Sequence, residues 1–185
     1  MRLFTGIDLP EPTARSLEQL LDRLRPLAPL KWSPLNNLHI TTRFIGEWPE
    51  GRLDELNGAL RAMPKPASFP VSIHGLGWYP NPHQPRVFFT GVEGGPELHN
   101  LAKATRGALE EIGLEAEERP YSPHITLARI GATASLQAVR QAIATLDSTD
   151  FGRFVVDRFH LYLSQPSPTA PGSRYTKLTQ FSFAE

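Results

Sequence analysis

The chain has 185 residues, 40% of them hydrophobic, with 19 basic and 19 acidic residues and no cysteine. The composition excludes a disulfide framework, a thiolate nucleophile and a cysteine-ligated metal, and the zero net charge argues against a protein that grips long nucleic acid through many phosphates. No apolar run approaches the roughly 20 residues of a membrane span and the N-terminus does not resemble a signal peptide, so we expect a cytoplasmic protein.

Strands and helices alternate along the first half of the chain, because the apolar residues switch between period two and helical spacing. Pro10 and Pro12 suit a turn or the entrance of a helix. In chain order we predict a strand at 2–9, a helix around 17–27, a strand that contains His39, a helix around 53–63 and a strand at 71–79.

The second half repeats this order after a proline-rich joint at 80–85. In chain order we predict a strand at 86–92, a helix at 98–112, a strand that contains His124, a helix at 136–146, one strand through 154–163, a loop at 165–173 and a final strand at 174–183.

The tripeptide His-Ile-Thr occurs twice, as His39-Ile40-Thr41 and His124-Ile125-Thr126, and the strands around it repeat at the same offset. We therefore interpret residues 1–185 as one domain with an internal repeat of about 1–83 and 84–185. The predicted fold is α+β and bilobed, with pseudo-two-fold symmetry and mainly antiparallel sheets around a central cleft. A doubly wound parallel sheet is the weaker alternative, because the chain has no glycine-rich phosphate loop.

Side chains alternate across a strand, so each His shares a face with the Thr two residues later. If the two copies face each other, both pairs converge on one small ligand. One neutral imidazole can then accept a proton from water while the other, as imidazolium, donates a proton to a leaving oxygen. The Thr41 and Thr126 hydroxyls can donate hydrogen bonds to phosphate oxygens, so this chemistry requires no metal.

Two arginines are candidate phosphate contacts. Simple alternation places Arg43 on the same face as His39, which makes it the better candidate on geometry. The same alternation places Arg129 opposite His124, unless a bulge or the strand end turns it back.

The segments RLFTGIDLP, HITTRFIGE, SPHITLARI and LYLSQ…YTKL together resemble the two-histidine (2H) phosphoesterases, in particular the RNA 2',3'-cyclic phosphodiesterases, also known as 2'-5' RNA ligases. The resemblance spans nearly the whole chain. It covers the motifs His39-Ile40-Thr41-Thr42 and His124-Ile125-Thr126-Leu127. The family more often has an aliphatic residue where Thr42 stands, and we expect Thr42 to point away from the cleft.

The resemblance implies hydrolysis of a terminal 2',3'-cyclic phosphate of RNA to a 2'-phosphomonoester without a metal or other cofactor, and in some relatives reversible ATP-independent 2'-5' ligation. It implies that His39 is the proton donor and His124 the proton acceptor. The expected partners are RNA 3' ends or small cyclic-phosphate nucleotides, with no membrane and no protein partner, and we expect a monomer. Two alternatives stay open: the same chemistry on a small nucleotide such as ADP-ribose cyclic phosphate, and a non-catalytic module that binds a nucleotide or an RNA end.

Aromatic residues flank both motif segments. Aromatic rings at a cleft can stack on a nucleobase, although such rings are more often core, and the candidates are Trp32, Trp48, Trp78, Tyr79 and Tyr121. Of these, Trp32 and Tyr121 are the candidates for substrate binding. The other histidines lack a partner motif, and we expect surface or packing roles for them: His74, His83, His99 and His160.

Overall fold

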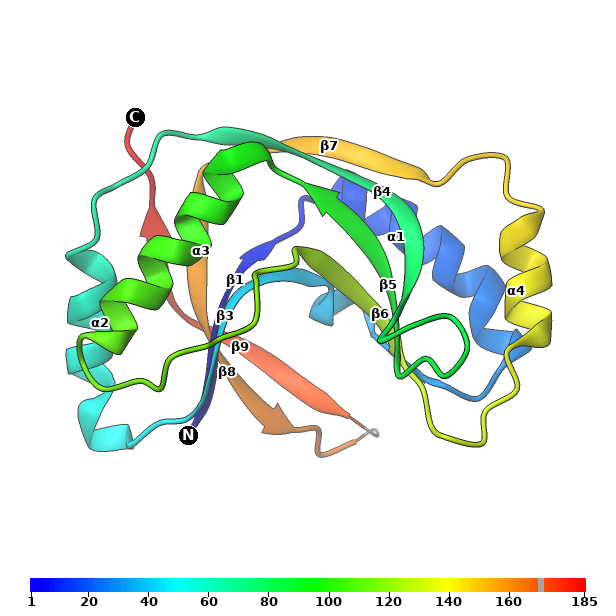
Figure 1. Cartoon of the computed structure of the whole chain (residues 1–185), viewed down its shortest axis with the longest axis horizontal. Coiled ribbons are helices and arrows are strands. Elements are labelled where there is room, and N and C mark those ends of the chain that lie inside the picture. The colour runs from blue at the N-terminus through cyan, green and yellow to red at the C-terminus, as the bar shows by residue number, and fades with distance from the viewer. Residues whose placement is uncertain (170–171) are drawn as a thin grey trace.

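Two antiparallel β-sheets form the two lobes of the structure, a computed structural model that describes residues 1–169 and 172–185 (Figure 1). The first sheet consists, in spatial order, of β3 (His39–Glu47), β1 (Arg2–Asp8), β8 (Arg158–Pro166) and β9 (Ser173–Ser182). The second sheet consists of β2 (Lys31–Trp32), β6 (His124–Arg129), β5 (Val87–Glu93), β4 (Phe69–Tyr79) and β7 (Asp150–Val156).

The helices lie in pairs beside the sheets (Figure 1). In the first lobe, α3 contacts β3 while α2 packs on α3 and β9; in the second lobe, α1 packs on β7. The helices are α1 (Glu11–Leu24), α2 (Leu53–Arg61), α3 (Gly95–Glu110) and α4 (Gln137–Ala144), with short 3-10 turns at η1 (Arg25–Leu27), η2 (Leu35–Asn37) and η3 (Glu50–Arg52).

The leucine spacing of the first predicted helix explains why α1 packs as it does. Leu17, Leu20, Leu21 and Leu24 all lie on its buried face. Burying each such side chain contributes roughly 1.5–3 kcal/mol relative to exposure, so this face fixes the helix on the core. The helix begins at Glu11, directly after Pro10 and with Pro12 in its first turn, so it starts earlier than the predicted range, and its last predicted residues form the 3-10 turn η1.

The α+β, bilobed and antiparallel architecture is confirmed, and each lobe is built from both halves of the sequence. The first half contributes β1 and β3 to the first sheet but β2 and β4 to the second. The second half contributes β5, β6 and β7 to the second sheet, and its last strands, β8 and β9, return to the first sheet. The closing strands therefore tie the two lobes together.

The prediction of one strand through 154–163 is wrong. The segment is two strands, β7 and β8, which belong to different sheets and are separated at Asp157. Neither glycine nor proline marks the change, so local sequence gives no signal for it. The predicted loop at 165–173 overlaps residues 170–171, which lie outside the described residues; β8 extends to Pro166 and β9 begins at Ser173.

Candidate active site

The two His-Ile-Thr motifs lie on strands that belong to different sheets and contact each other. His39 begins β3, His124 begins β6, and these two strands meet between the lobes. The charges of His124 and Arg129 both act on the His39 imidazole. The fold thus places one His-Thr pair from each sheet around a common space.

Each histidine is oriented by the backbone two residues before it. His39 Nδ1 lies 2.7 Å from the carbonyl oxygen of Asn37, and His124 Nδ1 lies 2.7 Å from that of Ser122. Because a carbonyl can only accept, both Nδ1 atoms carry the proton, and a neutral ring then keeps a lone pair on Nε2. In His39 this lone pair accepts a hydrogen bond from the Thr41 hydroxyl, at 2.7 Å.

The environment favours neutral rings in the ligand-free protein. Burial lowers the pKa of His39 to about 4, helped by the positive charges of His124 and Arg129 and opposed by the hydrogen bond to Asn37. Burial also lowers the pKa of His124, and Arg129 adds to the effect. An anionic phosphate between the rings would act in the opposite direction and favour the imidazolium.

This arrangement predicts how the two histidines titrate. In an NMR titration of the free protein, His39 should titrate near pH 4, and His124 below the value near 6.5 of an unperturbed imidazole. Saturation with a nucleoside 2'-monophosphate should raise both midpoints, because the phosphate stabilises the charged ring. His39→Gln assigns the signals. A His39 midpoint at or above 6.5 in the free protein would contradict the buried, neutral ring.

A β-bulge interrupts both motif strands at the fourth motif residue. On β3, Thr41 and Arg43 pair with consecutive residues of β1, so Thr42 is the extra residue. On β6, Thr126 and Ala128 pair with consecutive residues of β5, so Leu127 is extra. A bulge inverts the alternation of faces beyond it.

The bulges exchange the roles expected of the two arginines. The expectation that Arg43 shares the His39 face is wrong: its side chain is 9% exposed, and its guanidinium donates to the carbonyl of Glu115, at 2.7 Å. Arg129 is instead turned back toward His124, where it is exposed and lowers the pKa of both histidines. Thr42 points away from the cleft as expected, in a buried hydroxyl pair with Thr5, at 2.7 Å.

Trp32 does not reach the space between the histidines. Its ring packs on buried Phe88, with centroids 6.3 Å apart, and its indole N–H donates to the carbonyl of Ala28, at 2.9 Å. Trp32 pairs with Ala128, on the side of the second sheet opposite Arg129, so it is not placed to stack on a ligand held by the motifs.

Aromatic residues that the sequence did not single out surround His39. Phe4 lies 4.8 Å from the His39 ring, and Tyr175 and Tyr162 lie 5.3 and 5.9 Å from it, between ring centroids. Tyr79 and Phe89 take the matching places beside His124, at 5.3 and 5.5 Å. Period-two patterns place these residues on strands, but only the sheet order β3-β1-β8-β9 brings β8 and β9 to His39.

Each motif is held by a hydroxyl from the segment that leads into the other motif. The Tyr121 hydroxyl, three residues before His124, donates to the carbonyl of Thr41, at 2.8 Å. The Ser33 hydroxyl, on the way into His39, donates to the carbonyl of Thr126, at 2.9 Å. Both carbonyls lie beside a bulge, where strand pairing is interrupted. We call these two hydrogen bonds the cross-latches.

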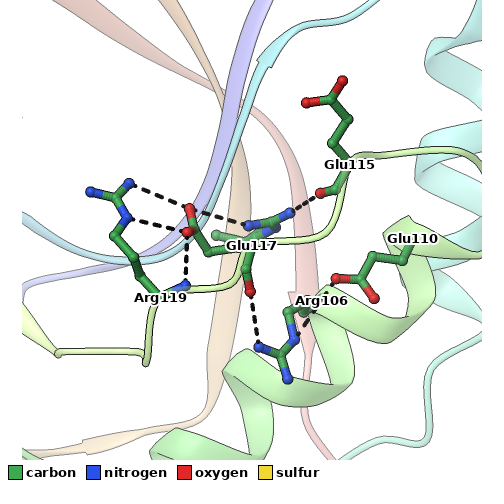
Figure 2. A network of polar contacts seen from close by, with 6 residues as sticks. Arg106, Glu110, Glu115, Glu117 and Arg119 are labelled. Carbon is green, nitrogen blue, oxygen red and sulfur yellow. Dashed lines mark hydrogen bonds and ion pairs between the residues drawn. The ribbon is translucent and has the colours of Figure 1, made fainter.

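The segment that carries Tyr121 is itself anchored to the first lobe. Figure 2 shows the carbonyl of Glu117 facing Arg106 of α3 and its carboxylate engaged by Arg119, with Glu115 alongside. Arg43 of β3 binds the Glu115 carbonyl, at 2.7 Å, and lies 3.9 Å from the Glu117 carboxylate. Arg43 therefore connects strand β3 to the segment that leads into the second motif.

Loss of a cross-latch should loosen the site without unfolding the protein. A net hydrogen bond contributes about 0.5–1.5 kcal/mol, so Tyr121→Phe and Ser33→Ala should each lower the turnover proposed below by about 2- to 10-fold. Thr145→Val is the matched control, because it also removes a hydroxyl that donates to a carbonyl, at the end of α4. If its turnover fell as far as that of Tyr121→Phe under steady-state assay, the cross-latches would have no special role.

Two further observations on the described residues concern a metal site and a membrane-spanning helix. In the part of the chain that the structure describes, no group of three or more His, Asp or Glu side chains is arranged to hold a metal ion. Over the same residues, no helix is both long and apolar enough to cross a membrane.

Paired antiparallel sheets with one His-Thr motif from each are the architecture of a two-histidine phosphoesterase. A family model described as the 2'-5' RNA ligase superfamily matches residues 10–166, and the chain belongs to this superfamily. This chain is 35% identical over 189 residues to the RNA 2',3'-cyclic phosphodiesterase of Thermus thermophilus, and the alignment covers 98% of this chain and 90% of the relative. A protein of the same name from Methanocaldococcus jannaschii is 30% identical over 172 residues, with 92% and 95% of the two chains covered.

A solved structure shows the same fold. The crystal structure of E. coli LigT complexed with 3'-AMP superposes with a TM-score of 0.80 and 26% identity, over 100% of this chain and 98% of the other. In that relative, the fold holds a nucleotide.

Proposed function

We propose that this protein hydrolyses the terminal 2',3'-cyclic phosphate of RNA to a 2'-phosphomonoester, with the two motif histidines as acid and base. The observation that carries the proposal is the matched orientation of His39 and His124, each with Nδ1 bound to a carbonyl and Nε2 left for proton transfer. The names of the relatives from Thermus and Methanocaldococcus support the same substrate.

The reaction proceeds by in-line attack. Water attacks phosphorus while the Nε2 lone pair of His124 accepts its proton, and the bond from phosphorus to the 3' oxygen breaks as imidazolium His39 donates a proton to that oxygen. The phosphate stays on the 2' oxygen. The negative phosphate supplies the field that raises the pKa of His39 from its low ligand-free value. Acid–base catalysis of this kind typically contributes 10²–10⁴-fold.

Three further groups can bind the phosphate oxygens, where negative charge accumulates. The Thr41 and Thr126 hydroxyls share faces with the histidines, and the Arg129 guanidinium completes the set. When substrate enters, Thr41 can redirect its hydroxyl from His39 Nε2 to a phosphate oxygen. These protein groups supply the required donors and proton carriers, so the proposed mechanism uses no metal.

The same pair can catalyse ligation if an RNA 5'-hydroxyl replaces water. His124 then accepts the hydroxyl proton, the 3' oxygen leaves with a proton from His39, and the product is a 2'-5' phosphodiester. No ATP is needed, because the strained cyclic ester is the activated donor. Hydrolysis and ligation therefore differ only in the nucleophile.

The decisive experiment is turnover of a short RNA that ends in 2',3'-cyclic phosphate, in the presence of EDTA, with identification of the phosphate position. We expect EDTA-resistant conversion to a 2'-phosphate, and no conversion by the double variant His39→Gln/His124→Gln. Inhibition by EDTA would contradict the metal-free mechanism. Turnover of ADP-ribose cyclic phosphate but not RNA would identify the small-nucleotide alternative, and tight product binding without turnover would identify a binding module.

A further inference from the structure

A cavity of about 540 Å³ opens beside His39 on the first sheet. It lies between the strand ends, the η2 segment that precedes His39 and the start of α1. Besides His39 and several apolar residues, the lining includes Asp8, Asn36, Asn37, Tyr162, Tyr175 and Lys177. The volume is within the usual range of small-ligand sites.

In-line chemistry decides what this cavity should contain. The attacking water and the leaving 3' oxygen occupy opposite ends of the reacting phosphorus, so the acid and the base lie on opposite sides of it. The leaving oxygen belongs to the ribose of the terminal nucleotide. If His39 protonates this oxygen, the ribose and its base must lie on the His39 side, and the cavity is the space available there.

We propose that this cavity is the subsite for the 3'-terminal nucleoside, with the Tyr175 ring as the surface against which its base packs. The proposal rests on the proposed function and on His39 as the proton donor. It makes Tyr175 a specificity-determining residue for a nucleoside cyclic phosphate.

The aromatic wall of the cavity fits a nucleobase. Tyr175 is only partly buried and meets the His39 ring edge to face, with centroids 5.3 Å apart. It is held from behind by Phe4, at 4.9 Å, and Phe4 in turn stacks on Tyr162, at 4.8 Å. This packing keeps the Tyr175 ring in place beside the acid. Base–aromatic stacking contributes about 1–3 kcal/mol per base and tolerates any base.

Polar groups in the lining of the cavity suit a ribose and the polar edge of a base. Asn36 is exposed, and its side-chain amide makes no hydrogen bond to the residues that the structure describes. Asn37 is already committed, because its amide donates to the carbonyl of Ser173, at 2.7 Å. The Lys177 ammonium bonds the Asp8 carboxylate, at 2.7 Å, so this rim presents an ion pair rather than a net charge.

A larger cavity, of about 730 Å³, lies beside α4 and is a weaker candidate. Its lining includes His83, Arg86 and Arg140 but neither His-Ile-Thr motif. A nucleoside there would have no motif residue beside it, whereas the smaller cavity includes the catalytic His39 in its wall.

The test compares two substrates that differ only in the base. One is a short RNA that ends in a nucleoside 2',3'-cyclic phosphate, and the other ends in abasic ribose 2',3'-cyclic phosphate. Wild type should lose about 5- to 150-fold in kcat/KM on the abasic substrate, which corresponds to the stacking contribution of one base. Tyr175→Ala should lose a similar factor on the normal RNA and little on the abasic one. Tyr175→Leu, which keeps apolar volume but removes the aromatic face, should do the same.

Tyr79→Ala is the matched control, because Tyr79 flanks His124 as Tyr175 flanks His39. On the proposed arrangement it affects both substrates equally. Equal turnover of both substrates by wild type, or an equal loss on both in the Tyr175 variants, would overturn the subsite. Loss of base discrimination in Tyr79→Ala instead would place the nucleoside beside His124.

A binding measurement keeps the subsite separate from the proposed reaction. Titration with a nucleoside 2'-monophosphate and with ribose 2-phosphate should show that wild type prefers the nucleotide and that Tyr175→Ala does not. If no RNA is turned over but this preference is present, the proposed function fails and the subsite stands. Absence of the preference overturns the subsite whatever the turnover.

Discussion

Replacement of His39 or His124 by glutamine should lower the rate of cyclic phosphate hydrolysis by about 10²–10⁴-fold, the usual contribution of a positioned acid or base. Glutamine can still donate to the Asn37 or Ser122 carbonyl but cannot carry a proton between water and the phosphate ester. Single-turnover kinetics measures the loss directly. Thermal unfolding is the control: both side chains are partly buried, so the comparison requires that each variant is still fully folded at the assay temperature.

The two variants should also differ in a way that separates the acid from the base. In the wild type, protonation of His124 should lower the rate at acidic pH, and deprotonation of His39 should lower it at alkaline pH. The test uses a substrate with sulfur in place of the leaving 3' oxygen. The sulfur can leave without being protonated, because a thiol is far more acidic than an alcohol. This substrate should therefore restore much of the rate of His39→Gln and little of that of His124→Gln. The reverse pattern would exchange the two roles.

The repeated motif made the two histidines predictable from the sequence. Strand periodicity is local, so it assigns Thr41 to the face of His39 and Thr126 to the face of His124 without knowledge of the rest of the fold. The repeat around the motifs then implies that the two strands are equivalent. This argument depends on residue identity and spacing alone, and in the structure both motifs begin strands that contact each other between the sheets.

The position of the two arginines was not predictable in the same way. A single extra residue in each strand, Thr42 and Leu127, exchanges the faces beyond it. A bulge depends on pairing with the neighbouring strand, and no local signal marks it here, since the bulged residues are an ordinary threonine and an ordinary leucine. Strand alternation alone pointed to Arg43, and only a bulge or the strand end could turn Arg129 back toward His124.

The order of strands in the sheets was the second feature that the sequence could not predict. The chain passes from β7 to β8 at Asp157 and moves from one sheet to the other. This step brings Tyr162 and Tyr175 to His39, although both are far from it in sequence. Long-range pairing of this kind arises from burial of whole sheet faces, which a local pattern does not contain. The site therefore combines a repeated His-Thr pair, which the sequence shows, with surrounding residues that only the fold brings together.

Because the bulges fall at the same motif position, the residues that follow them on β3 and β6 can be compared directly. Phe44 takes the place on β3 that Arg129 takes on β6, and its side chain is 63% exposed. The strand β6 thus carries a cation at this position, whereas β3 carries an exposed aromatic ring. Arg129 therefore has no equivalent cation on β3, and the proposed phosphate contact depends on this one guanidinium.

Arg129→Ala should consequently reduce kcat/KM for the cyclic phosphate by about 10²–10³-fold, the loss typical of one donor to a developing charge. Its stability should not change, because the side chain is exposed. Arg43→Ala should behave oppositely. Removal of its guanidinium leaves the Glu115 carbonyl without a donor and should lower the free energy of unfolding by about 1–3 kcal/mol, while turnover of the folded protein should fall much less than in Arg129→Ala.

Denaturant unfolding and turnover, measured on the same preparations well below the unfolding temperature, separate the two effects. Arg129→Lys is an informative companion, because lysine keeps the charge but loses the fork of donors that matches two phosphate oxygens, so it should recover only part of the rate. If Arg43→Ala lost more turnover than Arg129→Ala at equal folded fraction, the bulges would not exchange the faces as described, and Arg43 would be the residue that binds the phosphate.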